Sequence, residues 1–446
     1  MKELQQKDLK YIWHPCSQMK DYETFPPIVL ERGEGPYLYD VEGKRYLDAV
    51  SSWWVNLFGH SNKRINKVIA EQVGKLEHAI FANFSHKPAI ELAERIINIT
   101  PKGLNKVFFA DNGSSAVEVA LKLSFQYYQQ TGKKKKTRFV AISEAYHGET
   151  LGALSAGDID LYNEIYKPLL MKTFKVKGPD CYRCPYQETR ETCRGDCFEH
   201  MEKIVVEHHE EIAGILIEPM IQGAAGMKIY PAIYLKKLRK LCDDYDIHFI
   251  ADEIAVGFGR TGTMFACEHA GISPDIMCLS KGLTAGYMPL SLTLVTDEIY
   301  DAFYDDYIHL KAFMHSHSYT GNPIGCAIAC ESLRIFEDEN ILERNQRTSC
   351  MIRSRMEGLL EYPHVGEFRQ LGMVGAIELV KDKRTKEGFD WKQRVGYEIY
   401  KIALRYGVLL RPLGNIIYFM PPYVIDEKDI DLMIGTAEKA ITEYLG

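Results

Sequence analysis

Two residues that close apolar, strand-like runs could together do chemistry: Asp252 and Lys281. Asp252 ends the run Ile247–Asp252, and Lys281 directly follows the run Ile276–Ser280. A buried lysine is costly because its ammonium group loses water, so a lysine at the open end of a strand calls for a chemical reason. A lysine can form a Schiff base with an aldehyde, and an aspartate can hold a protonated ring nitrogen. This pair therefore predicts a site for pyridoxal phosphate (PLP).

A turn that could bind the phosphate of such a cofactor follows another strand-like run. In the segment 111–115 a glycine, Gly113, leads into an amphipathic helix that begins with Ser114 and Ser115. Free backbone N–H groups and the positive end of a helix favour an anion, and the serine hydroxyls add donors. The bland alternative is that Ser114 or Ser115 only caps the helix.

Three further loops follow predicted strands or open a helix. Tyr146 could stack on an aromatic ring, although it could also be a surface aromatic. Glu218 and Gln222 could hydrogen-bond near the site, or could simply be polar loop residues after a strand. The polar loop 312–323 could supply a second set of phosphate donors or cap the helix that follows.

The segment Gly257–Gly262 matches the dinucleotide-binding pattern G-x-G-x-x-G, which is a weak signal alone. The preceding strand-like run ends several residues earlier, at Asp252, and no long helix pattern follows Gly262. These features favour a glycine-rich structural loop over nicotinamide binding.

Strand and helix patterns alternate between about residues 65 and 330, which is typical of a largely parallel sheet covered by helices. Ligands of such sheets bind at the carboxyl ends of the strands. We expect a large domain at 65–334 and a smaller α/β domain at 335–446, against which the segment 1–64 packs. The strand candidates are Lys106–Ala110, Arg138–Ile142, Ala213–Ile217, His248–Ala251, Ile276–Leu279 and Leu292–Val295, with helices at Ser114–Gln130 and Pro231–Tyr245.

Beyond that region we expect a hairpin at Gly35–Leu47, a charged helix-like stretch at Leu333–Leu360, and strands at Leu371–Val380 and Ile416–Met420.

The composition of the 446 residues, 46% hydrophobic and 26% charged, is ordinary for a globular protein. The net charge of −7 gives no sign of nucleic-acid binding, and the basic run Lys133–Lys136 is expected to be a solvated loop. There is no apolar signal segment and no run long enough for a membrane span. Eleven cysteines, several within apolar runs, fit reduced thiols in a cytoplasmic protein.

Taken together, the motifs resemble those of the class III, PLP-dependent aminotransferases of fold type I over nearly the whole chain. That fold has a large domain with a mainly parallel, seven-stranded sheet and a smaller α/β domain built from both termini. The motifs are Asn112–Ser114, Tyr146–Gly148, Glu218–Pro219, Asp252–Glu253, Gly257–Gly262, Ser280–Gly282 and Gly321–Pro323.

Three other segments are similar to one branch of that class, the 7,8-diaminononanoate synthases of biotin synthesis: Ile12–Pro15, Ser51–Trp54 and Arg411–Pro422. That branch converts 8-amino-7-oxononanoate (KAPA) to 7,8-diaminononanoate (DAPA). The resemblance implies this reaction, with another ω-aminotransferase of long amines or ketones as the alternative.

The resemblance also implies a role for each matching residue. Lys281, Asp252 and Tyr146 would be catalytic, and the active sites would be shared within a homodimer. The implied cofactor contacts are Gly113, Ser114, Tyr146, Asp252 and Lys281, with His317 and Ser318 reaching the phosphate of the partner subunit. The implied substrate contacts are Trp53, Trp54, Tyr146, Lys281, Ser316 and Arg411, where the tryptophans line an apolar slot and Arg411 pairs the carboxylate. Ordinary core packing is the alternative for the two tryptophans.

Two positions depart from the main branch of that family. The main branch has Thr where this chain has Ser318, and Tyr where this chain has Cys16. Loss of a large aromatic at the substrate mouth weighs against S-adenosylmethionine, the donor of the main branch. We therefore expect lysine, the donor of another branch, and keep S-adenosylmethionine as the alternative.

A cysteine-rich insertion at 181–197 has the pairs C-x-x-C and C-x-x-x-C. Four thiolates at this spacing could bind zinc, but aminotransfer needs no metal. Reduced thiols are therefore expected, and the alternatives are a structural zinc bound by Cys181, Cys184, Cys193 and Cys197 or a labile disulfide.

Overall fold

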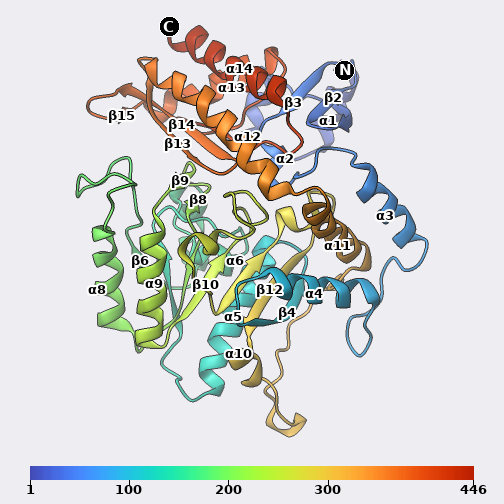
Figure 1. The fold of residues 1–446 in the computed structure, drawn as a ribbon, viewed down its shortest axis with the longest axis vertical. Coiled ribbons are helices and arrows are strands. Elements are labelled where there is room, and N and C mark those ends of the chain that lie inside the picture. Colours follow the sequence, from blue (N-terminus) through green and yellow to red (C-terminus); the bar gives the residue numbers. More distant parts are fainter.

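A computed structural model describes residues 1–446, and its centre is a seven-stranded sheet in the order β4-β12-β11-β10-β7-β5-β6 (Figure 1). Only β12 runs antiparallel to its neighbours, so the expected mainly parallel sheet of an α/β protein is confirmed. The strands are β4 (Leu104–Ala110), β5 (Arg138–Ile142), β6 (Phe174–Val176), β7 (Ile212–Ile217), β10 (His248–Asp252), β11 (Ile276–Leu279) and β12 (Ser291–Thr296).

The two faces of this sheet bury alternate residues of each strand. Ile250 and Cys278 pack in one hydrophobic cluster with helix α5 (Gly113–Gln130). Phe249 and Leu279 belong to the second and larger cluster, on the other face. Successive side chains of a strand point to opposite faces, which explains why these strands are apolar throughout. The other helices of this part are α3 (Lys63–Val73), α4 (Lys87–Ile99), α6 (Leu151–Ala156), α7 (Asp160–Asn163), α8 (Glu199–His208), α9 (Ala232–Tyr245), α10 (Asp297–Asp301) and α11 (Pro323–Asp338).

Both ends of the chain lie together at the top of Figure 1. The N-terminal strands β1 (Leu30–Glu34), β2 (Tyr37–Asp40) and β3 (Arg45–Asp48) form one sheet with β16 (Val408–Leu409). The predicted hairpin is the β2–β3 pair. A second sheet holds β13 (Val365–Leu371), β14 (Val374–Asp382), β18 (Ile416–Phe419), β17 (Pro412–Leu413) and β15 (Glu387–Gly388). The helices here are α1 (Lys2–Tyr11), α2 (Ser51–Trp54), α12 (Ile341–Met356), α13 (Val395–Arg405) and α14 (Glu427–Leu445); a short pair β8 (Ile221–Gln222) and β9 (Lys228–Ile229) lies below them.

Two predicted elements are interrupted. The helix-like stretch at Leu333–Leu360 is two helices, because Asn340 is left-handed (φ 48°) between α11 and α12. The strand predicted at Leu371–Val380 is a tight hairpin of β13 and β14 that turns at Gly372 (φ 57°). A Cβ at Gly372 would lie 2.4 Å from the carbonyl carbon of Thr261, so glycine is needed for this close approach.

The prediction that Lys133–Lys136 is a solvated loop was wrong for its last residue. Lys136 is buried, and its Nζ donates to the carbonyls of His209, Ile212 and Tyr245 at 2.9, 3.0 and 3.3 Å. Burial lowers the pKa of this ammonium to about 8. The three carbonyls replace the water that the charge loses.

Candidate active site

The residues of interest meet in a cavity of about 220 Å³ at the carboxyl ends of the parallel strands. Asp252 is the last residue of β10, and Lys281 lies two residues beyond β11. The walls of the cavity are Trp54, Asn112, Gly113, Ser114, Tyr146, His147, Gly148, Glu218, Asp252, Ile254, Ala255 and Lys281.

Lys281 stands in a strained backbone conformation at this edge. Its φ is 44°, in the left-handed region that non-glycine residues rarely adopt. The preceding Ser280 is anchored by a hydrogen bond from its Oγ to the carbonyl of Leu290 (2.8 Å). Burial lowers the pKa of Lys281 from its usual value, while the carboxylates of Asp252 and Glu218 oppose that shift. A lowered pKa increases the fraction of neutral amine, which is the nucleophilic form.

The carboxylate of Asp252 is buried and fixed at both oxygens. Oδ2 lies 2.7 Å from Nδ1 of His147, and Oδ1 accepts a hydrogen bond from the backbone N–H of Ile254 (3.1 Å). An ionised carboxylate held in this way can stabilise a cation in the cavity, such as a protonated ring nitrogen.

The predicted phosphate turn is present, and neither serine is the helix cap. Asn112 is the N-cap of α5, since its Oδ1 accepts the N–H of Ser115 (3.0 Å). The hydroxyl of Ser114 faces the cavity and accepts the N–H of Glu149 (3.2 Å), which leaves its own proton free to donate. A Cβ at Gly148 would lie 2.2 Å from Ser114 Oγ, so only glycine keeps this space open. The first turn of α5 and this hydroxyl fit a phosphate group.

Glu218 lines the cavity, and Gln222 lies behind it in the same loop. Glu218 accepts the backbone N–H groups of Tyr146 (3.2 Å) and Gly223 (2.9 Å), and burial raises its pKa to about 7. Gln222 donates to the carbonyl of Ser143 (3.0 Å). Both side chains therefore hold loops of the site in place. This agrees with the expectation that they hydrogen-bond near the site and are not merely polar loop residues.

At the mouth of the cavity the structure adds two residues that the sequence patterns did not indicate, Glu149 and Tyr162. Tyr146 donates its hydroxyl to Glu149 Oε1 (3.0 Å), and its ring lies 5.5 Å from that of Tyr162. The thiol of Cys16 also points to Glu149 Oε1, at 3.7 Å. Glu149 lies three residues after Tyr146, and this spacing is the signal that could have drawn attention to it.

The two adjacent tryptophans have different surroundings. Trp54 is buried, lines the cavity and donates from Nε1 to the hydroxyl of Tyr418 (2.9 Å). Lys281 Nζ lies 5.1 Å from the centre of the Trp54 ring system. Trp53 is 41% exposed, and the guanidinium carbon of Arg411 lies 4.0 Å from its ring centre. Trp53 is therefore not an ordinary core residue.

Arg411 also lines a second groove of about 470 Å³, which is linked to the cavity through the contacts of Cys16 and Tyr146 with Glu149. Its aromatic walls include Tyr22, Phe25 and Tyr400, and Cys16 lies at one side. The guanidinium and the apolar walls can hold a molecule that has a carboxylate and a hydrophobic chain.

Ser316, His317 and Ser318 do not line the cavity of their own chain. His317 Nδ1 lies 3.1 Å from Oδ2 of Asp111, which starts the phosphate turn. The contact of His317 and Ser318 with a partner subunit's phosphate remains a prediction.

The glycine-rich segment Gly257–Gly262 is a turn that holds a buried arginine. Arg260 donates to the carbonyls of Pro421 (2.9 Å) and Asn56 (3.0 Å). The segment thus links the large sheet to both ends of the chain, in agreement with a structural loop.

Comparisons with known proteins agree with this geometry. The family model for class-III aminotransferases matches residues 18–441. Two enzymes called adenosylmethionine-8-amino-7-oxononanoate aminotransferase are similar over almost their full length. The one from Geobacter sulfurreducens is 48% identical over 98% of this chain and 97% of its own. The one from Anoxybacillus flavithermus is 44% identical over 99% and 97%.

Solved structures give the same picture. The enzyme of that name from Methanocaldococcus jannaschii superimposes with a TM-score of 0.94 at 41% identity, covering 100% of both chains. An omega transaminase from Pseudomonas jessenii in complex with PMP has a TM-score of 0.94 at 32% identity, covering 99% of this chain and 98% of its own.

Proposed function

Because the chain belongs to the class-III aminotransferases, we propose that it converts KAPA to DAPA in biotin synthesis. The chain is a PLP-dependent transaminase of fold type I. The observation that supports the KAPA assignment most strongly is the placement of Arg411 against Trp53, the sequence neighbour of Trp54 in the wall of the Lys281 cavity. The names of full-length relatives at 40–48% identity support the same substrate.

When bound, PLP supplies an aldehyde that takes up an amino group and an aromatic ring that accepts an electron pair. The residues of the cavity fit this group. Lys281 would bind the aldehyde and then move a proton from its Nζ to and from the substrate carbon. Asp252 would hold the ring nitrogen protonated, and Tyr146 would pack against the ring and the substrate. Gly113 and Ser114 would bind the phosphate.

The acceptor pocket is argued from the two tryptophans and Arg411. KAPA has an aliphatic chain that ends in a carboxylate. Trp54 would cover the part near Lys281 and Trp53 the middle of the chain. Arg411 would pair the carboxylate, and its stacking on Trp53 fixes the plane of the guanidinium. Ser316 lies outside the cavity of its own chain, so its proposed substrate contact would be made in the partner subunit's site.

Lysine is the proposed amino donor. Cys16 is a small side chain at the groove where the main branch has a tyrosine, so this position lacks the aromatic ring that would contact S-adenosylmethionine. The relatives are named for adenosylmethionine, which makes S-adenosylmethionine the second donor to test.

The experiment supplies KAPA with either lysine or S-adenosylmethionine and measures DAPA by mass spectrometry. We expect DAPA with lysine and much less with S-adenosylmethionine. DAPA with S-adenosylmethionine only would keep the reaction and overturn the donor. No DAPA with either, from protein that retains its bound PLP, would overturn the KAPA assignment.

A second candidate is an ω-aminotransferase for another long amine or ketone. Its support is the TM-score of 0.94 with omega transaminases at 32% identity. Such an enzyme would turn over a long-chain ketone without a carboxylate at least as well as KAPA. The carboxylate requirement therefore separates the two functions.

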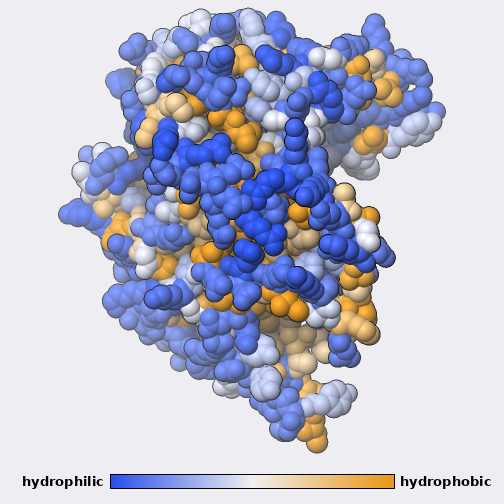
Figure 2. Space-filling view, turned by 45° about the vertical axis from the view of Figure 1, so that its right-hand side comes forward, coloured by the Kyte–Doolittle hydropathy of each residue, from blue (hydrophilic) through white to orange (hydrophobic).

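We also propose a homodimer with shared active sites in the cytoplasm. Large apolar side chains are exposed on the loop that projects at the bottom of Figure 1, among them Tyr307 (92%), Ile308 (80%) and Met314 (87%). Figure 2 shows a largely hydrophilic face with scattered apolar areas. Exposed apolar side chains that gather on one segment suit contact with a second subunit. All eleven cysteines are free thiols, as in a reducing compartment. No helix has the length and apolar character needed to cross a membrane.

A further inference from the structure

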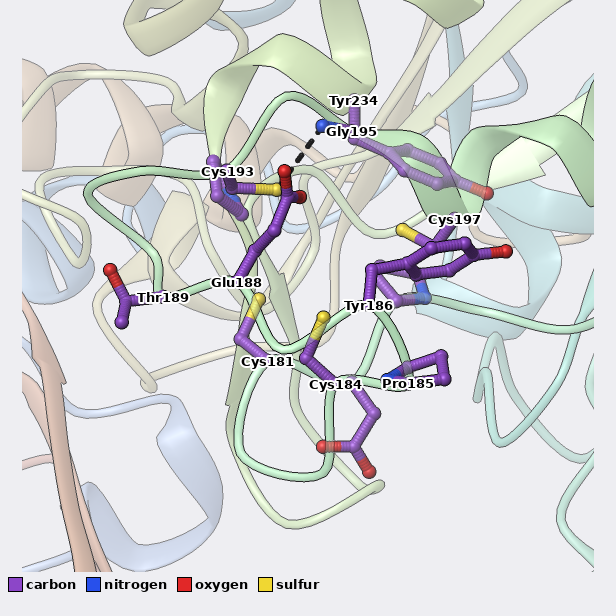
Figure 3. A pocket seen from close by; sticks show the side chains of 13 residues that line it. Cys181, Cys184, Pro185, Tyr186, Glu188, Thr189, Cys193, Gly195, Cys197 and Tyr234 are labelled. Carbon is purple, nitrogen blue, oxygen red and sulfur yellow. Dashed lines mark hydrogen bonds between the residues drawn. The ribbon is translucent and has the colours of Figure 1, made fainter.

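The four cysteines of the insertion come together around one small space. Cys181, Cys184, Cys193 and Cys197 all line a pocket in the segment that joins β6 to α8, next to Tyr234 of α9 (Figure 3). The central space of about 20 Å³ is the size of a single water molecule or ion. None of the four is in a disulfide. The four cysteines lie within residues 181–197, and transamination supplies no reason for them to converge.

The local backbone suits metal binding. The second pair, Cys193 and Cys197, encloses Gly195, whose φ of 70° lets the chain turn sharply. The N–H of Gly195 donates to Cys193 Sγ at 3.3 Å, a bond that stabilises a thiolate. Cys181 and Cys197 are partly buried and pack against the main hydrophobic core, which shields this space from water.

We propose that Cys181, Cys184, Cys193 and Cys197 bind one Zn²⁺ as a structural site. Sulfur-only, four-coordinate sites are typical of zinc, with Zn–S distances of about 2.3 Å. As the structure stands, no three ligand side chains have the geometry of a metal site, so the sulfurs must move inward around the ion. Each thiol releases its proton as it binds. Glu188 also lines the pocket, but Arg194 pairs it at 2.9 Å.

The insertion contacts the C-terminal sheet through two ion pairs, so its rigidity affects that sheet. Arg183 and Arg190, which lie within it, pair with Glu378 on β14 and Glu367 on β13. Both glutamates also pair with the buried Arg369.

Arg369 in turn donates to the carbonyls of Gly226 (2.5 Å) and Met227 (2.9 Å). The same loop contains Gly223, which packs on Trp54 and hydrogen-bonds to Glu218. Zinc would therefore fix the arginines that tie the large sheet to the C-terminal strands behind the active-site wall.

The test measures zinc per chain by mass spectrometry in full-length protein purified without added metal. We expect about one zinc per chain, a lower melting temperature after a strong chelator, and recovery on adding zinc. The variants Cys184→Ser and Cys197→Ser should lose the zinc. The control Cys350→Ser, an exposed cysteine on α12, should keep it.

If the variants fail to fold, the zinc content of the wild-type protein tests the proposal by itself. Sub-stoichiometric zinc with four reactive thiols in the insertion would overturn the site. Sub-stoichiometric zinc with disulfides among these cysteines would overturn it in favour of a redox link.

Discussion

His147 Nδ1 lies 2.7 Å from Oδ2 of Asp252, and both side chains are buried at the carboxyl end of β10. The histidine comes from the loop after β5, and β7 lies between β5 and β10 in the sheet, so this contact joins the ends of two strands that are not neighbours. The partner fixes the carboxylate in one orientation, toward the cavity that also holds Lys281. The ring nitrogen of the cofactor would lie beside the fixed carboxylate of Asp252.

Replacing the Asp252 carboxylate by a neutral group should lower the turnover rate and leave the fold intact. Asp252→Asn keeps the shape of the side chain but removes its charge, and loss of a single preorganised electrostatic contact lowers kcat by about 10²–10³-fold. Steady-state turnover of KAPA measures the effect. Asp431→Asn, which changes an exposed aspartate paired with Arg355, should have no effect. Turnover of Asp252→Asn within a few-fold of wild type would contradict the role.

Ser114 should contribute to retention of the cofactor. Ser114→Ala removes a hydroxyl at the start of α5, and a hydrogen bond to a charged group is worth about 1.5–3 kcal/mol. We expect PLP to bind about 10–100-fold more weakly, as measured by dialysis and absorbance. The neighbour Ser115 bonds to Asn112 and not to the cavity, so Ser115→Ala serves as the matched control. Equal retention of PLP by both variants would exclude a phosphate contact by Ser114.

Arg411 should determine the requirement for a carboxylate. Arg411→Lys keeps the charge but loses the planar fork and its stacking on Trp53. We expect kcat/KM for KAPA to fall about 10–100-fold, mainly through KM. Arg405→Lys changes an exposed arginine paired with Glu443 and should match wild type. If Arg411→Lys leaves KM unchanged, the carboxylate binds elsewhere.

His248 should make the protein sensitive to acid. It is buried against Tyr127 and Tyr128, and burial lowers its pKa to about 3 from the ordinary 6.5. Below about pH 6.5 His248 therefore binds a proton in the unfolded chain but stays neutral in the folded chain. The free energy of unfolding falls as the pH drops through this range. Between pH 7.5 and 5 the loss from this group is about 2 kcal/mol.

The variant His248→Asn tests this linkage. Its free energy of unfolding should be lower than that of wild type at neutral pH, and the difference should narrow as the pH falls to 5. Denaturant titrations at a series of pH values measure this. A difference that stays constant or widens toward pH 5 would show that His248 is not held neutral.

The strand ends that carry the chemistry could be predicted, because each apolar run of the sheet is followed directly by its functional residue. Asp252 and Lys281 follow β10 and β11, and the phosphate turn follows β4. The seven-stranded sheet brings these strand ends together. Its edge strand β6 has only three residues, which is too short for an alternating hydrophobic pattern to predict it.

The missed features all depend on contacts between distant parts of the chain. Arg260 is buried by carbonyls at positions 56 and 421, and Lys136 by carbonyls between 209 and 245. Charged side chains of this kind look solvated in the sequence, since their partners are backbone atoms that leave no local signal. Glu149 was missed because its contact with Cys16 joins side chains 133 positions apart.

The most direct test of the account is the absorption spectrum of the purified protein, recorded before and after lysine and then after KAPA. We predict a visible band from the cofactor held by Lys281 that bleaches with lysine and returns with KAPA. Such a cycle would establish cofactor, donor and acceptor together. A band that responds only to S-adenosylmethionine would overturn the donor, and no band even after PLP is supplied would contradict the role of Lys281.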